Sequence, residues 1–230
     1  MRLYSFLKNN LNITKSEVMK LNTEGRILVS GKVQNLSRNI REGEIVTVDG
    51  VEIKNQEFVY YLYNKPKGVI CTNNKDVKGN IINELKIDKR IYAVGRLDKD
   101  TRGLIILTND NKLTHFVLES KMIEKEYIAK VKEKLDSDML KRMSETIEID
   151  GKMTCQAKVK MIDKNIVSIT ILEGRYHQVR KLIMHAGCHL IDLQRIRIGN
   201  VSLDEEKIKE GSYQEVKNLN DIIRSLQWKI

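Results

Sequence analysis

Several residue types are scarce in this sequence. Its 230 residues include one proline and three cysteines, and aromatic side chains make up 5%. The cysteines, Cys71, Cys155 and Cys188, lie far apart and form no C-x-x-C pair, which argues against a disulfide framework and a zinc site. No apolar run approaches the ~18–20 residues of a membrane span, and the N-terminus lacks the apolar core of a signal peptide. These absences predict a cytoplasmic protein without a membrane segment.

Motifs for common cofactors and nucleophiles are also absent. The sequence contains no G-x-S-x-G, no G-x-x-x-x-G-K and no G-x-G-x-x-G. It therefore offers no serine nucleophile elbow, no phosphate-binding loop of the P-loop type and no dinucleotide fingerprint. We expect a protein that works without a cofactor.

What the sequence does contain is an excess of basic charge. Lys and Arg number 41 against 31 for Asp and Glu, a difference of +10. Such an excess favours a polyanionic partner, with nucleic acid ahead of an anionic membrane surface. Hydrophobic residues make up 41%, which is enough for a sizeable core.

Residues 1–58 are predicted to form a unit of their own. Apolar residues recur at helical spacing over residues 3–11, and Thr14 or Ser16 can cap a second helix. Alternating apolar residues separated by tight turns then predict several short strands. This α+β unit has nine basic and seven acidic residues, so +8 of the net charge lies in the rest of the chain.

Residues 59–230 form the second predicted unit, in which strands predominate. A tyrosine-rich strand runs into Lys65-Pro66-Lys67-Gly68, where proline fixes φ and glycine permits a tight turn, so that both lysines are presented together. The strict strand–helix alternation of a doubly wound fold is absent, so we expect an α+β fold. Further elements are predicted as strands near 125–135, 156–162 and 165–172 and as helices over 136–146 and within 173–190.

The stretch 174–200 is strongly basic, since it has five Lys or Arg and one acid, Asp192. These cations surround a turn that leads into a helix, an arrangement that suits phosphate contact at a helix N-terminus. The stretch also holds His177, His185 and His189. Carboxylates at ligand spacing are missing, so no metal site is expected.

One acid is notable for its setting. Asp98 lies within VGRLDKDTRGLIILTND (94–110), with basic residues on both sides and an apolar run after it. Such an acid can be a nucleophile, a base, a metal ligand or a member of a salt bridge. A second carboxylate of the kind that glycosidases use is not evident, because neither Asp100 nor Asp110 has a matching setting.

Four segments of the chain resemble the signature segments of the RNA pseudouridine synthases. In the family's order, they are NKPKG (64–68), GRLDKDTRGLIILTND (95–110), KEYIAKV (125–131) and EGRYHQVRKL (173–182). The first unit is similar to the S4-type domain of the RsuA/RluB/RluE/RluF branch. The resemblance implies a small S4-like RNA-binding domain, 1–58, and a pseudouridine synthase catalytic domain, 59–230, with a mixed, mainly antiparallel central sheet flanked by helices.

The resemblance also implies roles for individual residues. Asp98 matches the catalytic carboxylate, which adds to the ribose of a flipped-out uridine or removes a proton from it. Tyr127 would stack on the uracil and help take up the C5 proton, and Arg180 would pair with Asp98. Arg96 would fill the gap that the flipped base leaves in the RNA. Further RNA contacts are expected from Lys65, Lys67, Arg175, Tyr176, His177, Gln178, Lys181 and Arg197 in the second unit and from Arg2, Lys15 and Arg26 in the first.

Within the branch, EGRYHQVRK and the ending RIRIGNVSLD are closer to the small-subunit enzymes (RsuA). The resemblance thus implies a monomer that converts one uridine of 16S rRNA (uridine 516 in the usual rRNA numbering), free or in a small-subunit assembly intermediate. Three alternatives remain: a large-subunit (23S) rRNA pseudouridine synthase, an inactive RNA-binding or ribosome-assembly module, and a nucleoside hydrolase, which would need a second acid.

Overall fold

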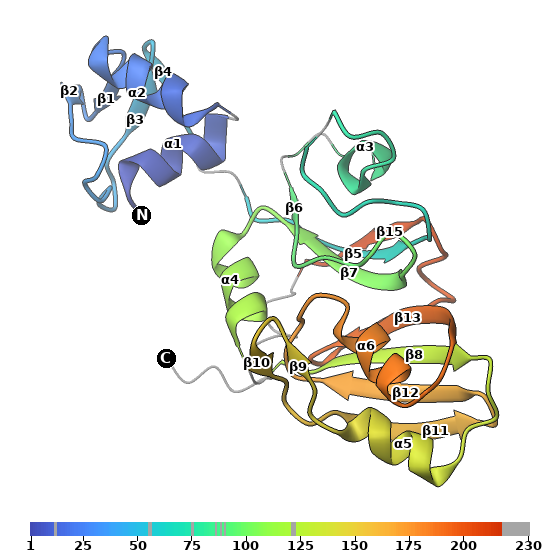
Figure 1. Cartoon of the computed structure of the whole chain (residues 1–230). Coiled ribbons are helices and arrows are strands. Elements are labelled where there is room, and N and C mark those ends of the chain that lie inside the picture. Colours follow the sequence, from blue (N-terminus) through green and yellow to red (C-terminus); the bar gives the residue numbers. More distant parts are fainter. Residues whose placement is uncertain are drawn as a thin grey trace. The chain divides into compact units, whose positions relative to one another are not determined.

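The structure is a computed structural model of the chain. It describes residues 1–217 apart from 12, 55, 56, 75, 86, 88, 90, 121 and 122. The chain folds into two compact units, Met1–Phe58 and Val59–Ile230, and residues 218–230 of the second lie outside the described part. Figure 1 shows the helices and strands of both units. Each unit has its own hydrophobic core. None of the described helices is long and apolar enough to cross a membrane.

The first unit packs two helices with a small sheet. Thr14 caps the second helix, since its hydroxyl accepts from the Glu17 amide while the Glu17 carboxylate accepts from the Thr14 amide, the reciprocal pattern of a capping box. The predicted helices and short strands of this unit are present. They are α1 (Leu3–Leu11), α2 (Lys15–Thr23), β1 (Ile27–Val29), β2 (Lys32–Val33), β3 (Val46–Val48) and β4 (Val51–Glu52), and the strands pair in the order β2-β1-β3-β4.

The second unit is built on one large sheet. Its strands are β5 (Tyr60–Lys65), β6 (Tyr92–Ala93), β7 (Arg102–Thr108), β8 (Lys125–Val131), β11 (Lys158–Asp163), β12 (Ile166–Ile171), β13 (Leu190–Ile198), β14 (Val201–Ser202) and β15 (Tyr213–Glu215). A separate hairpin is formed by β9 (Glu148–Ile149) and β10 (Lys152–Met153). The helices are α3 (Ile81–Leu85), α4 (Asn111–Glu119), α5 (Ser137–Ser144) and α6 (Gln178–His185).

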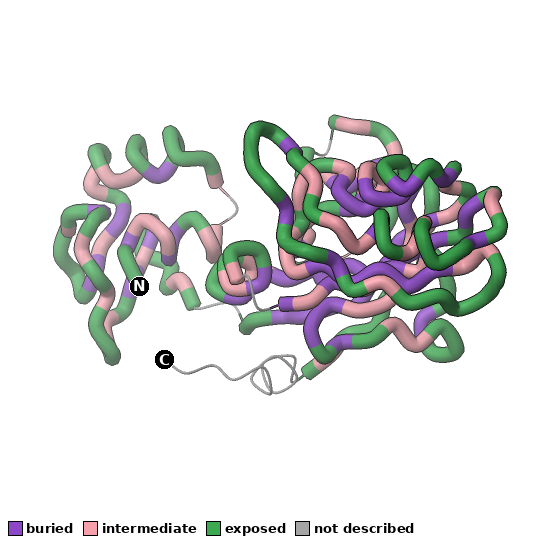
Figure 2. Tube along the Cα trace, turned by 60° about the horizontal axis from the view of Figure 1, so that its bottom comes forward, coloured by how far each residue is buried: buried purple, intermediate pink, exposed green. Residues whose placement is uncertain are grey.

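The sheet is mixed and mainly antiparallel, as predicted. Its main path is β11-β12-β8-β13-β7-β5-β15, and only the β13–β7 pairing in this path is parallel. Both faces are covered by apolar side chains. On β5, Tyr61 and Tyr63 enter one core while Tyr60 and Leu62 enter another, because successive strand residues point to opposite faces. Buried stretches accordingly run through the strands of this sheet (Figure 2).

Helix α6 lies against the sheet beside α5. The face predicted from the sequence is buried: Val179, Leu182 and Ile183 are at most 5% exposed, and Ala186, just past the helix end, is fully buried. This packing fixes the start of α6 relative to the sheet.

Gly103 allows β7 and β13 to approach each other. Its φ is +107°, which favours glycine, and a Cβ at this position would collide with the backbone of Arg195. In the parallel register, Arg195 lies opposite Gly103. Gly103 therefore allows Arg195 to lie next to β7, the strand that follows the Asp98 loop.

Candidate active site

A pocket forms in the second unit where the β6–β7 loop, β8, β13 and the start of α6 meet. Its volume is about 120 Å³, so it admits a group much larger than one water molecule, which occupies ~30 Å³ in the liquid. Asp98 is the only carboxylate among the described residues that line it. The basic lining residues are Arg96, Lys125, Arg175, Arg180 and Arg195.

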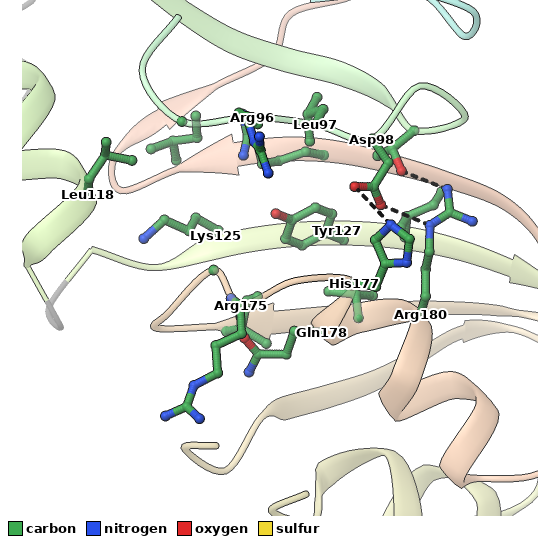
Figure 3. Close-up of a pocket in the computed structure, with 18 of the residues that line it drawn as sticks. Arg96, Leu97, Asp98, Leu118, Lys125, Tyr127, Arg175, His177, Gln178 and Arg180 are labelled. Carbon is green, nitrogen blue, oxygen red and sulfur yellow. Dashed lines mark hydrogen bonds and ion pairs between the residues drawn. The ribbon is translucent and has the colours of Figure 1, made fainter. Parts of the chain in front are cut away.

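Asp98 is held by a network that spans the β6–β7 loop and α6 (Figure 3). Arg180 donates from Nε to Asp98 Oδ2 at 3.0 Å and from Nη2 to the Thr101 hydroxyl at 2.9 Å. Thr101 is buried, and its amide donates to the Asp98 carbonyl at 3.0 Å. The ion pair implied by the family resemblance is thus present, and Thr101 fixes both partners.

His177 lies on the other side of the same carboxylate. It is the N-cap of α6 with φ +56°, a left-handed conformation that is uncommon for residues other than glycine. Its Nε2 lies 3.4 Å from Asp98 Oδ1. Its ring stacks on the exposed Tyr176, with 3.9 Å between centroids, and Lys181 Nζ lies 5.7 Å from the Tyr176 centroid. His177 was expected to contact RNA, but the structure places it beside the acid.

Tyr127 lies between two differently charged parts of the pocket. It is 8% exposed and projects from β8 between Lys125 and the Asp98–Arg180 pair (Figure 3). In the sheet register, Tyr127 lies opposite Arg195 of β13. Directly opposed residues on neighbouring strands point to the same face, which brings the tyrosine and this arginine to one pocket.

The prediction that Lys65 contacts RNA is wrong, because this lysine is fully buried. Its Nζ donates to the carbonyls of Pro66 and Val69 at 2.8 Å and of Lys99 at 3.4 Å. Burial lowers its pKa. Since Lys99 directly follows Asp98, Lys65 anchors the loop that carries the acid. Lys67, by contrast, is 45% exposed and pairs with Asp192.

Arg175 and Gln178 also differ from expectation. Gln178 lines the pocket but is 2% exposed, and its side chain binds the Glu173 carboxylate and the Arg175 amide. The Arg175 guanidinium binds Glu173 and the β9–β10 hairpin, in place of the predicted phosphate contact. Its partners in the hairpin are the carbonyls of Ile149, Lys152 and Met153.

Arg197 is excluded from the pocket by a register shift. Strand alternation would put Arg195 and Arg197 on one face, but the β13–β8 pairing is irregular between them. Arg195 lines the pocket, whereas Arg197 binds Glu124 and Glu126 with N–O distances of 3.0 and 2.7 Å and also binds the Gly199 carbonyl. Its predicted phosphate contact is therefore replaced by contacts within the protein.

The other predicted RNA contacts lie at the surface. Arg96 is exposed at the pocket, and Tyr176 is 60% exposed. In the first unit, Arg2 and Lys15 are exposed, and Arg26 pairs with Asp49 with both N–O distances at 2.6 Å.

Sequence reasoning missed three polar residues of the pocket: Thr101, Lys125 and Arg195. Lys125 and Arg195 are 7% and 4% exposed. Strand alternation could have predicted that Lys125 and Arg195 point inward. Lys125 precedes Tyr127 by two residues, and Arg195 follows the buried Leu193 by two residues, so each lies on the same strand face as a buried residue.

No group of three His, Cys, Asp or Glu side chains suited to a metal ion occurs in the described part of the chain. His185 binds Glu145 at 3.0 Å, and His189 binds Glu133 at 2.6 Å. The two histidines thus pair with different carboxylates.

Most of the second unit matches a known protein family. The profile of a family described as RNA pseudouridylate synthase matches residues 59–185, which is 127 of 230 residues. The chain belongs to the RNA pseudouridine synthase family. Members of this family isomerise uridine in RNA, and the matched region contains Asp98, Tyr127 and Arg180.

Individual pseudouridine synthases resemble nearly the whole chain. The ribosomal small subunit pseudouridine synthase A of Haemophilus influenzae is 32% identical, covering 93% of this chain and 95% of its own. The ribosomal large subunit pseudouridine synthase B of Bacillus subtilis is 34% identical, covering 79% of each. A crystal structure described as a pseudouridylate synthase aligns with a TM-score of 0.69 at 28% identity, covering 98% of this chain and 99% of the other.

Proposed function

We propose that this pseudouridine synthase acts on ribosomal RNA and that Asp98 is its catalytic carboxylate. The observation that carries the proposal is the lone acid in a positively charged pocket, with Arg180 on one oxygen and His177 near the other. Arg180 places a permanently charged guanidinium beside the Asp98 carboxylate. The absence of a second acid among the described lining residues disfavours a hydrolase, which must activate water.

The flipped uridine would enter this pocket and lie against Tyr127. Asp98 then attacks the ribose or removes a proton from it, and both routes break the N1–C1′ bond. The base turns, C5 joins C1′, and the C5 proton leaves with help from Tyr127. Base flipping costs a few kcal/mol, and the exposed Arg96 would occupy the gap left in the RNA.

We further propose 16S rRNA, free or in a small-subunit assembly intermediate, as the substrate. The segments EGRYHQVRK and RIRIGNVSLD and the 32% identity to the small-subunit enzyme of Haemophilus influenzae support this choice. The 34% identity to a large-subunit enzyme makes 23S rRNA the competing substrate.

The first unit, 1–58, is proposed to be an S4-like RNA-binding domain, which matches its small α+β architecture and its exposed Arg2 and Lys15. We propose that the protein acts as a monomer in the cytoplasm. Three free cysteines agree with a reducing compartment.

The experiment that tests this function compares two RNAs labelled with tritium at uracil C5. Forming the C5–C1′ bond must expel the C5 hydrogen, so the full-length protein should release one label per converted uridine from 16S rRNA and none above background from 23S rRNA. Release from 23S rRNA alone would overturn the substrate assignment. Free labelled uracil would show a hydrolase, and RNA binding without release would show an inactive binder.

A further inference from the structure

Arg195 is a buried cation with an unused donor. It is 4% exposed, its Nε donates to the Leu104 carbonyl at 2.8 Å, and its side chain lines the pocket. Its Nη2 is buried and has no hydrogen-bond partner among the described residues. No ion pair joins Arg195 to a carboxylate within the part of the chain that the structure describes. Arginine is almost never fully buried unless it is paired, so this arrangement needs an explanation.

The fold keeps this unsatisfied group in place. Leaving a buried donor unpaired costs roughly 1–3 kcal/mol, and more when the group is charged. Gly103 lets β7 approach the Arg195 backbone, and the register places the arginine beside Tyr127. Two features of the sheet thus hold Arg195 where its Nη2 has no partner among the described residues, which indicates that the partner arrives with the substrate.

A second buried cation lines the same pocket. Lys125 is 7% exposed, and its Nζ binds only the carbonyls of Ile123 and Leu172, at 3.1 and 3.5 Å, among the described residues. Burial, together with the positive charge of Arg195, lowers its pKa to about 8. At neutral pH this part of the pocket therefore holds two positive charges. Asp98 is the only acid among the described lining residues, and Tyr127 separates Lys125 from the Asp98–Arg180 pair (Figure 3).

The isomerisation creates a negative charge that fits this site. When N1–C1′ breaks, the electron pair of the bond stays on the base and spreads from N1 to O2 and, through the ring, to O4. The anion exists until C5 supplies the electrons for the bond to C1′, after which the C5 proton leaves and N1 gains a proton. Donors fixed where charge develops in a water-poor site stabilise a transition state strongly.

We propose that Arg195 donates from Nη2 to an exocyclic carbonyl oxygen of the flipped uracil and, with Lys125, holds the negative charge of the departing base. Asp98 would act on the sugar, while Arg195 and Lys125 act on the leaving group. The inference rests on the proposed function, because it requires the target uridine to occupy this pocket.

The test is a double-mutant cycle between the protein and single atoms of the base. We would measure label release under single-turnover conditions from an rRNA fragment that the wild-type protein converts, with the target uridine as such, as 2-thiouridine or as 4-thiouridine. Sulfur is a weak hydrogen-bond acceptor, so each substitution weakens a contact at one position. The variants are Arg195→Lys, which keeps the charge, and Arg195→Gln, which keeps a planar donor. The control is Arg142→Lys, because Arg142 lies outside the pocket and also donates to a backbone carbonyl, that of Ala186.

We expect one of the two thio substitutions to slow label release at least ~10-fold for the wild-type protein and for the Arg142→Lys control. The same substitution should slow the Arg195 variants less than ~3-fold, because they have already lost the contact with that oxygen of the base. Thermal unfolding shows which variants are folded, and either folded variant completes the cycle. Two results would overturn the inference. One is that each thio substitution slows the wild-type protein and the Arg195 variants equally, and the other is that the Arg195 variants convert uridine as fast as the wild-type protein. Arg195 would then only connect β13 to β7. Because wild-type release on uridine tests the proposed function separately, the two can fail independently.

Discussion

Replacing Arg180 by methionine removes the partner of Asp98 and keeps a long side chain. The Arg180 Nε lies 3.0 Å from Asp98 Oδ2, and the side chains of the arginine and the acid are 28% and 36% exposed. Exposed ion pairs contribute ~0–1 kcal/mol, whereas breaking a buried pair costs ~3–5 kcal/mol. Because solvent screens this pair in the free protein, we expect the free energy of unfolding to fall by only about 1 kcal/mol.

The effect on catalysis should be larger, because bound RNA covers the pocket and removes that screening. If the pair then contributes ~3–4 kcal/mol, the rate of label release falls by a factor of ~10²–10³ at ~1.4 kcal/mol per tenfold. Arg180→Lys should lie between methionine and wild type, since an ammonium keeps the charge but loses the planar fork that reaches both Asp98 and Thr101.

Lys141→Met is the matched control, since Lys141 is an exposed cation on α5 outside the pocket. Its rate should stay within ~2-fold of wild type. The assay is single-turnover tritium release with saturating protein, accompanied by thermal unfolding. A folded Arg180→Met protein with a rate within threefold of the Lys141→Met control would refute the proposed ion-pair role.

Three further outcomes are expected. Removing residues 1–58 should leave a folded second unit, because the two units have separate cores. The truncated protein should bind rRNA at least ~10-fold more weakly, because one of two linked binding modules is lost. If the truncated protein no longer melts cooperatively, the two units do not fold independently. Lys65→Met should lower the free energy of unfolding by ~2–4 kcal/mol, because it leaves buried carbonyls without their donor. The control, Lys67→Met, should change the free energy of unfolding by less than ~1 kcal/mol. Equal denaturation midpoints for the two variants would contradict this prediction. Label release should fall as pH rises through about 8, where Lys125 loses its charge, and Lys125→Arg should abolish that fall. Because the unfolded chain keeps this proton up to the ordinary lysine pKa, the free energy of unfolding should rise with pH from about 8 to that range. A profile with the same fall in Lys125→Arg would exclude Lys125 as its source.

Much of the local structure could be predicted from the sequence. Apolar spacing located α1 and α6, and alternation located β8, because these patterns reflect which face of an element is buried. The apolar run Leu104–Leu107 is fully buried in β7, as the sequence suggested. The order of the strands was beyond such patterns, since β13 lies between β8 and β7 through long-range pairing.

Some residues at the pocket could likewise be predicted from the sequence, and others could not. The family motifs supplied Asp98, Tyr127 and Arg180, which lie on three distant segments and meet only in the folded unit. Lys65 was misjudged because a lysine near a turn is ordinarily solvated, and its carbonyl partner on Lys99 is 34 residues away. Arg197 was misjudged because an arginine in a basic segment is ordinarily solvated, whereas this one binds Glu124 and Glu126, which lie 73 and 71 residues away in the sequence.

The measurement that tests the central claim most directly is tritium release by Asp98→Asn. Asparagine keeps the size and most polar contacts of the side chain but can act neither as a nucleophile towards the ribose nor as a base. We predict that the variant folds, binds the rRNA fragment with an affinity within ~3-fold of wild type, and releases no label above background, while the wild-type protein releases one label for each uridine converted. Release of label by Asp98→Asn at the wild-type rate would contradict the assignment of Asp98 as the catalytic carboxylate.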